Sequence, residues 1–349
     1  MPIPAAVLAA LMLLAPQFPT SHAGSIRVGA VQGNGPAAYV DVHQPNAVLE
    51  SQLAASAPLE DEQVDVVLWP EGSVDGDALA EEATAHVLNE AAHRYGAPIL
   101  LNAASTDGLL VYNTTLLWTE AGAVGTHAKR HPVPFGEHVP DRWLYSAIAP
   151  GLVNLIQREY TPGTDTPVID IDDSPVGLAV CFDVAFDDVI REGALSGAQV
   201  LMFQTNNADF RGTDENLQQL AFARMRAIET GRSVVNLSTT GTSQIFAPDG
   251  TTLAALPVDE PGLMIADLEL RDGLTAGVML GRPLEIVIVS GALAALATLG
   301  LLILRGARAD FWSGGFHLRR LHSRAPAQDG AHRQPGRVLD RPVAEQANG

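Results

Sequence analysis

Apolar runs and amphipathic segments alternate along the chain from residue 25 to about residue 270. Short apolar or β-rich runs such as "IRVGAVQGN" and "VDVVLWP" predict strands. Segments such as "DALAEEATAHVLNEAAHRYG" have helical spacing, and Gly96 at the end of this one is a good C-cap. Because strands alternate with helices, the pattern predicts an α/β sandwich with sheets inside and helices outside.

Further strands are predicted on both sides of a long irregular stretch. Before it come "APILLNAAS", "LLVYNTTLLWT" and "AVGTHAKR". After it we expect strands at 167–171, 176–181 and 199–205, a helix near 186–196 and a second helix in "ENLQQLAFARMRAIETG". The runs "SVVNLST", "TSQIFAP" and "TTLAAL" predict the last strands, the final two joined by a Pro-Asp-Gly turn.

The irregular stretch covers residues 131–166. A connection of this length in a compact domain is usually functional or disordered, and its apolar content argues against disorder. The apolar residues in question are Trp143, Leu144, Tyr145, Ile148, Leu152 and Leu155.

An uncharged segment of 19 residues runs from Ile286 to Leu304. It would be about 28 Å long as a helix, nearly the thickness of a bilayer core, so we predict a transmembrane helix over 284–304. Arg305 and Arg308 follow at once, and positive flanks mark the cytoplasmic side. The rule predicts a cytoplasmic tail and an extracytoplasmic domain over 25–280.

The first 24 residues allow two interpretations. Their apolar run, Ala5 to Ala15, is too short to span a bilayer. Ser21, His22 and Ala23 form a small-residue cleavage pattern that favours a signal peptide, although no Lys or Arg precedes the run. The alternative is the stub of a truncated transmembrane segment.

Composition narrows the functional classes. The net charge is −19, yet residues 305–349 carry eight Arg and four acidic residues, so the rest of the chain is more acidic still. This basic tail is predicted to be disordered, and the acidic body has no basic stripe for nucleic acid. A single cysteine excludes an intrachain disulfide, and no Cys/His spacing indicates a metal site.

Three residue types mark the candidate chemistry. Cys181 is the one cysteine and follows an apolar strand-like run, and Lys129 is the one lysine in a chain that otherwise uses Arg. Glu71 follows another apolar run, "VDVVLW". Each alone fits a structural or incidental role, but together they predict a thiol nucleophile, a carboxylate base and an ammonium.

Several motifs in order resemble the nitrilase (carbon–nitrogen hydrolase) superfamily, and within it the apolipoprotein N-acyltransferases. They are "VGAVQGN", "WPEGS", "YNTTLLWTEAGAVGTHAKRHPVPFGEHVP", "REYTPGT", "VCFDVAFDD" and "RMRAIETGRSVVNLSTTGTSQIFAPDG". The resemblance covers about residues 26–280. The "PFGEHVP" element followed by a transmembrane helix favours the acyltransferases over soluble amidases.

The resemblance implies a nitrilase-like α-β-β-α sandwich followed by one transmembrane helix. It assigns Cys181 as nucleophile, Glu71 as general base and Lys129 as the third catalytic member. It also matches Glu137 to a second carboxylate near the active site, and Asp183 stands where the acyltransferases usually have Glu. We predict substrate or oxyanion roles for these two residues, for Phe182 directly after the nucleophile, and for two aromatic residues of the 131–166 segment, Trp143 and Tyr145.

The implied reaction needs no cofactor. An acyl chain would pass from a membrane phospholipid to Cys181 as a thioester, and then to the N-terminal S-diacylglyceryl cysteine of a bacterial lipoprotein. The 131–166 segment would exclude water and hold acyl chains. The enzyme would lie in the bacterial cell membrane.

Departures from the family pattern keep two rival functions open. At most a fragment of the family's preceding membrane domain remains, and "TNNADFRG" replaces the usual "TNDAWFG", losing an aromatic residue. One rival is a membrane-tethered amidase that transfers the acyl group to water. The other is a non-catalytic anchor or partner for another membrane enzyme.

Overall fold

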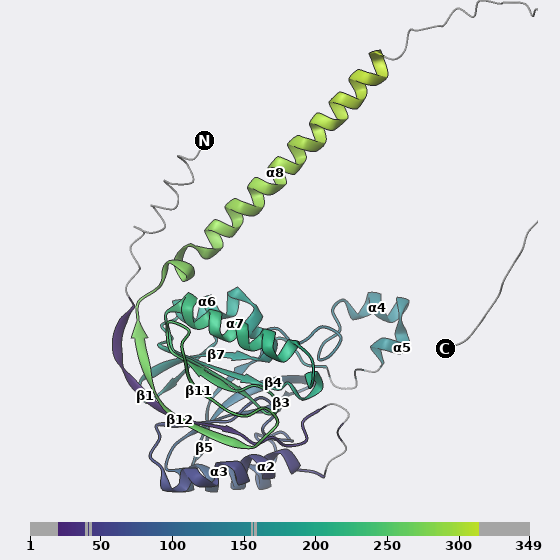
Figure 1. The fold of residues 1–349 in the computed structure, drawn as a ribbon. Coiled ribbons are helices and arrows are strands. Elements are labelled where there is room, and N and C mark those ends of the chain that lie inside the picture. The colour runs from purple at the N-terminus through teal and green to yellow at the C-terminus, as the bar shows by residue number, and fades with distance from the viewer. Residues whose placement is uncertain (1–19, 39–40, 42–43, 155, 157–158, 314–349) are drawn as a thin grey trace, which may run out of the picture. The chain divides into compact units, whose positions relative to one another are not determined.

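The computed structural model describes residues 20–38, 41, 44–154, 156 and 159–313 (Figure 1). The chain divides into two compact units, the first ending at Ile286 and the second beginning at Val287. The expected signal peptide or membrane stub falls mainly on residues 1–19, outside the described residues. Most of the basic tail lies outside them too.

Two six-stranded sheets form the centre of the first unit, and they share one arrangement. In each, three parallel strands have one antiparallel neighbour on one side and two on the other. The N-terminal sheet has the order β12 (Gly262–Asp272), β1 (Ser21–Gln32), β2 (Val66–Leu68), β3 (Ile99–Asp107), β4 (Leu110–Thr119), β5 (Gly122–Ala128). The C-terminal sheet has the order β6 (Val168–Ile171), β7 (Ser174–Val180), β8 (Val200–Thr205), β9 (Val234–Ser238), β10 (Gln244–Phe246), β11 (Thr252–Ala255).

Helices cover the outer face of each sheet (Figure 1). One apolar cluster joins side chains of both sheets, among them Val28, Leu68, Val176 and Met202. A second cluster packs the N-terminal sheet against α2 (Ala47–Ser56), the short helix η1 (Ala57–Asp61) and α3 (Glu82–Tyr95). A third packs the C-terminal sheet against α6 (Asp187–Leu195) and α7 (Glu215–Thr230). The predicted α-β-β-α sandwich is confirmed.

Two boundaries differ from the expectations. The strand β1 begins at Ser21, four residues before the domain start expected at residue 25, because it pairs with β12 along its whole length. No strand was expected at β12, although the alternation in "ADLELR" is a strand signal. The helix expected from residue 77 begins at Glu82.

The 131–166 segment contains two short helices, α4 (Arg142–Ile148) and α5 (Pro150–Val153), where irregular structure was expected. Glu159 connects the last part of the segment to its first half. Its carboxylate accepts hydrogen bonds from the N–H of Val139 (2.9 Å) and from Arg142 Nη1 (2.8 Å). Trp143 and Ile148 are 76% and 69% exposed. Leu155 and the side chain of Leu152 are outside the described residues.

The helix α8 (Ala276–Ser313) begins ten residues before Ile286 and runs past residue 305. Among the described residues it is the one helix long and apolar enough to cross a membrane, over Ala276–Arg305. Its most apolar stretch of 18 residues has a mean hydropathy of 2.5, and none of that stretch is buried by the rest of the protein. It is therefore a candidate membrane span.

Candidate active site

Each expected catalytic residue follows the end of a strand. Lys129 comes directly after β5 and Cys181 directly after β7, while Glu71 lies three residues beyond β2. All three line one cavity of about 660 Å³, together with Glu137. The structure thus brings together residues from both sheets.

Lys129 is buried between two carboxylates. Its Nζ lies 3.0 Å from Glu71 Oε1 and 2.7 Å from Glu137 Oε2. Burial would lower the pKa of Lys129, but the charges of Glu71 and Glu137, together with Cys181 when its thiol is ionised, outweigh it and raise the pKa well above its usual value. The lysine is therefore a fixed ammonium, not a proton acceptor.

Glu71 is held by a chain of amide side chains. Asn113 Nδ2 donates to Glu71 Oε1 at 2.8 Å, Asn102 Nδ2 donates to Asn113 Oδ1 at 2.8 Å, and the N–H of Gly72 donates to Asn102 Oδ1 at 2.8 Å. Burial raises the pKa of Glu71, with Lys129 opposing the shift. A carboxylate with a raised pKa is a better proton acceptor than an exposed one.

Sequence reasoning missed both asparagines. Asn113 begins an Asn-Thr-Thr glycosylation pattern, but its side chain is buried beside Glu71. Asn102 lies in β3 next to Asn113 in β4, in a sheet whose other inward residues are mostly apolar. A buried amide in such a strand is the signal that could have identified them.

Cys181 occupies a strained turn between β7 and the short helix η2 (Cys181–Ala185). Its φ is 50°, in the left-handed region that non-glycine residues seldom adopt, at a cost of about 1–3 kcal/mol. A sharp strand-to-helix turn of this kind presents a nucleophile at the end of a strand.

The Cys181 thiol is buried, and burial together with the charge of Glu71 raises its pKa to about 12, with Lys129 and Gln219 acting in the opposite direction. Gln219 Nε2 donates to Sγ at 3.3 Å. The thiol is therefore protonated at neutral pH and needs a base before it can attack. Gln219, on α7, is a contact that sequence reasoning also missed.

Asp183 lies behind the nucleophile and does not line the cavity. Its carboxylate accepts the backbone N–H groups of His131 (2.7 Å), Arg130 (3.2 Å) and Val180 (3.2 Å). These bonds join the segment that follows Lys129 to the turn that carries Cys181. In this structure the contacts of Asp183 are those of a positioning residue, and the substrate role expected for it stays a prediction.

Glu137 is the one member of the second group whose side chain reaches the cavity; besides Lys129, its Oε2 accepts the N–H of Val133 at 2.8 Å. The side chain of Phe182 packs edge-on against Phe186 instead. Trp143 and Tyr145 are also absent from the cavity wall, although Tyr145 packs edge-on against Phe135, which lines it.

Asp209 and Phe210, in η3 (Ala208–Phe210), line the cavity where the acyltransferase pattern would place an aromatic pair. Within the part of the chain that the structure describes, no group of three or more His, Cys, Asp or Glu side chains could hold a metal ion. A buried thiol, a carboxylate with a raised pKa and a fixed ammonium are together suited to acyl transfer through a covalent thioester.

Several curated proteins are similar in sequence to this chain. The apolipoprotein N-acyltransferase of Mycolicibacterium smegmatis is 33% identical over 328 residues, which are 87% of this chain and 54% of that protein. The enzyme of the same name from Shewanella oneidensis is 27% identical over 77% of this chain and 54% of its own length. The chain therefore spans about half the length of these curated relatives.

The fold has solved counterparts as well. A mutant of the Nesterenkonia AN1 amidase, from the nitrilase superfamily, superposes with a TM-score of 0.57 at 20% identity, covering 76% of this chain and 97% of that one. The model of the carbon–nitrogen hydrolase family matches residues 27–273, which include all three catalytic candidates. The chain belongs to the carbon–nitrogen hydrolase family.

Proposed function

We propose that this chain is a membrane-bound acyltransferase that moves an acyl group from a phospholipid to the α-amino group of a lipoprotein's N-terminal S-diacylglyceryl cysteine. The observation that carries the proposal is the buried set of Glu71, Lys129 and Cys181 in one cavity. The names of the curated relatives support the acyl transfer.

In the first half-reaction, Glu71 takes the thiol proton while Cys181 Sγ bonds to the carbonyl carbon of the phospholipid ester. Two N–H groups of Lys129 point to Glu71 and Glu137, and the third would stabilise the oxyanion with the backbone N–H of Phe182. The ester C–O bond then breaks. Glu71 returns the proton to the departing alkoxide, which leaves as a lysophospholipid.

In the second half-reaction, the amine nitrogen of the lipoprotein attacks the thioester carbon and the C–S bond breaks. One amine proton passes through Glu71 to Sγ, so the thiol is restored and an amide is formed. The cavity wall carries four carboxyl groups and one ammonium: Glu71, Asp75, Glu137 and Asp209 against Lys129. This charge would attract the acceptor in its ammonium form, which then releases one proton to solvent before the neutral amine attacks.

The exposed apolar residues of the 131–166 segment would cover the acyl chains and exclude water, which otherwise competes for the thioester. For the topology we infer a bacterial cell membrane, with the catalytic unit outside and the tail inside. This orientation rests on Arg305 and Arg308 at the end of the apolar part of α8.

Intact mass spectrometry tests the proposal most directly. The full chain in phospholipid vesicles, without acceptor, should gain the mass of one acyl group, and Cys181→Ala should gain none. Addition of a synthetic S-diacylglyceryl peptide with a free amine should discharge the adduct and yield an acylated peptide.

The rival functions give other results. Free fatty acid with no acylated peptide would establish the membrane-tethered amidase or hydrolase. A chain that gains no adduct from any phospholipid, while Cys181 still reacts with a small alkylating agent, would favour a non-catalytic partner.

A further inference from the structure

The helix α7 has an apolar stripe on its solvent side. Leu217, Met225 and Ile228 are 58%, 60% and 55% exposed, and Ala221 between them is exposed as well. At 100° per residue these four positions fall within one narrow arc of the helix, opposite the buried residues Ala223, Ala227 and Thr230 that face the sheet. We call these four residues the α7 stripe.

The fold itself does not require this stripe. The equivalent outer helix of the other layer, α3, packs on its sheet in the same way, yet its exposed positions are mostly polar or charged: Glu82, His86, Glu90, His93 and Arg94. A helix in water normally has one apolar face, toward the core. A second apolar face on α7 indicates another surface to cover it.

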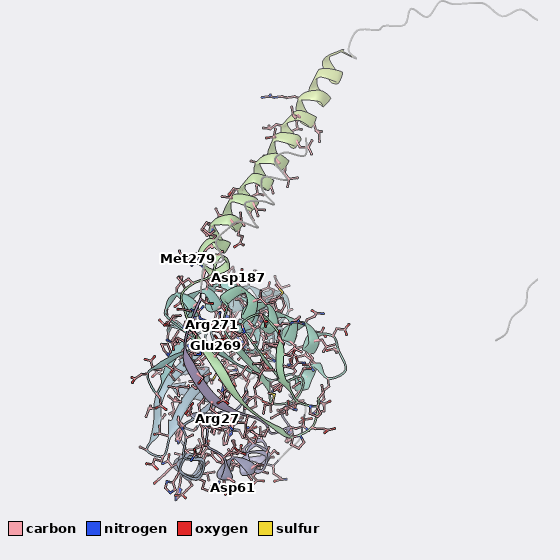
Figure 2. All side chains as sticks on the ribbon, turned by 60° about the vertical axis from the view of Figure 1, so that its left-hand side comes forward. Arg27, Asp61, Asp187, Glu269, Arg271 and Met279 are labelled. Carbon is pink, nitrogen blue, oxygen red and sulfur yellow. The ribbon has the colours of Figure 1, made fainter. Side chains whose placement is uncertain are left out.

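The stripe adjoins the start of the candidate membrane span. The hydroxyl of Thr275 donates to the carbonyl of Glu229, near the end of α7, and Arg191 Nε of α6 donates to the Val278 carbonyl at 2.9 Å. In Figure 2, Met279 and Asp187 are labelled at the α6–α7 end of the domain and Asp61 at the opposite end. The first residues of α8 continue the apolar surface with Met279, Leu280 and Leu284, all exposed.

The other end of α7 leads to the cavity. Phe210, half-exposed and on the cavity wall, lies five residues before Glu215, the first residue of the helix. At 1.5 Å per residue, the stripe from Leu217 to Ile228 extends about 17 Å along α7, between the start of α8 and the mouth of the site.

Charge on this helix also differs from the rest of the chain. The net charge is −19, but no carboxylate occurs between Leu217 and Ile228, and Arg224 borders the stripe. A membrane surface bearing anionic lipids repels carboxylates and attracts arginine.

We propose that the α7 stripe lies on the surface of the lipid bilayer that α8 enters, and so holds the mouth of the cavity at the level of the lipid headgroups. The contact is with lipid, not with a second copy of the chain. It is independent of the chemistry at Cys181.

Depth-dependent quenching in vesicles tests this contact. In a Cys181→Ser background, Met225→Cys and Val87→Cys each provide one labelling site; Val87, on the outer side of α3, is 39% exposed and is the matched control. The full chain, carrying a fluorescent probe, is reconstituted alone in phosphatidylcholine vesicles that contain a minority of phosphatidylglycerol and nitroxide-labelled lipid.

We expect the Met225 probe to be quenched several-fold more than the Val87 probe, with little change at high salt because the contact is mainly apolar. Leu217→Gln combined with Ile228→Gln should reduce that quenching toward the control, with an unchanged melting temperature. Equal, weak quenching at both sites would overturn the proposal. So would a short distance between Met225 labels of two chains that persists on dilution in lipid, because it would assign the stripe to a second copy.

Discussion

The N-terminal and C-terminal sheets have the same strand arrangement, but they hold their candidate catalytic residues by different means. Glu71 and Lys129 belong to the N-terminal sheet and are fixed by a buried polar network with Asn113 and Glu137. Cys181 belongs to the C-terminal sheet and is presented by a strained backbone, with one side-chain bond from Gln219. The shared strand arrangement therefore sets where these residues lie, whereas the local hydrogen bonds and backbone conformation set the reactivity of each side chain.

The outer helices of the two layers extend the contrast. Both layers must bury one face against a sheet, and they do so with similar apolar clusters. Only the α7 layer exposes a second apolar face beside the start of α8. Because folding places the same demand on both layers, the difference points to a role outside the domain's own core.

The largest effect on activity is expected for the substitution of Cys181, which follows a strand of the C-terminal sheet. Cys181→Ala should abolish acyl-adduct formation, because no other thiol exists in the chain. Removing one sulfur atom from a small buried side chain should leave the melting temperature within a few degrees. Mass spectrometry with phospholipid vesicles, and circular dichroism on heating, measure the two quantities. Normal turnover in this variant would exclude the thioester mechanism.

Lys129→Arg tests the polar network of the N-terminal sheet. A guanidinium keeps the charge, but it cannot fit as a compact donor between Glu71 and Glu137. We expect Lys129→Arg to be nearly as inactive as Lys129→Ala, each raising the barrier by about 3 kcal/mol, roughly 10²-fold in rate. Single-turnover acylation rates measure the loss. A near-normal rate in the arginine variant would show that only long-range charge matters.

Asp183 joins the segment that follows Lys129 to the turn that carries Cys181. Its substitution should therefore lower the stability of the folded protein more than the rate of acylation. Asp183→Ala removes the acceptor of the buried N–H of Val180, at a cost of about 1–3 kcal/mol, and of the part-buried N–H groups of His131 and Arg130, at a smaller cost. We expect a fall of several degrees in melting temperature along with slower acylation. Asp183→Asn keeps one acceptor oxygen and serves as the control, with a smaller fall. An unchanged melting temperature in Asp183→Ala would remove its positioning role.

The layers, and the three candidate residues that meet in one cavity, could be predicted because both leave local signals in the sequence. Period-two and helical patterns mark the strands and helices, and single occurrences of cysteine and lysine single out Cys181 and Lys129. Contacts across the fold leave no such signal. From its place beside the nucleophile in the sequence, Asp183 looks like a cavity residue, yet its carboxylate accepts the backbone N–H of His131, 52 residues away. Gln219 is one of two adjacent glutamines, and only the packing of α7 decides which one meets the thiol.

The smallest expected effect concerns this pair of glutamines. Gln219 donates to Cys181 Sγ and thereby lowers the thiol pKa, so Gln219→Leu should raise it further. Below its pKa, a thiol has a thiolate fraction that falls about ten-fold for each unit by which the pKa rises. At any fixed pH between 7 and 10, alkylation of Cys181 by iodoacetamide should therefore slow by about three- to ten-fold, and the pH–rate profile should move to higher pH. Gln218→Leu changes the exposed neighbour on the same helix and should leave the profile unmoved. If both variants gave the wild-type profile, the bond from α7 would have no part in activating the thiol, and Glu71 and Lys129 alone would set its reactivity.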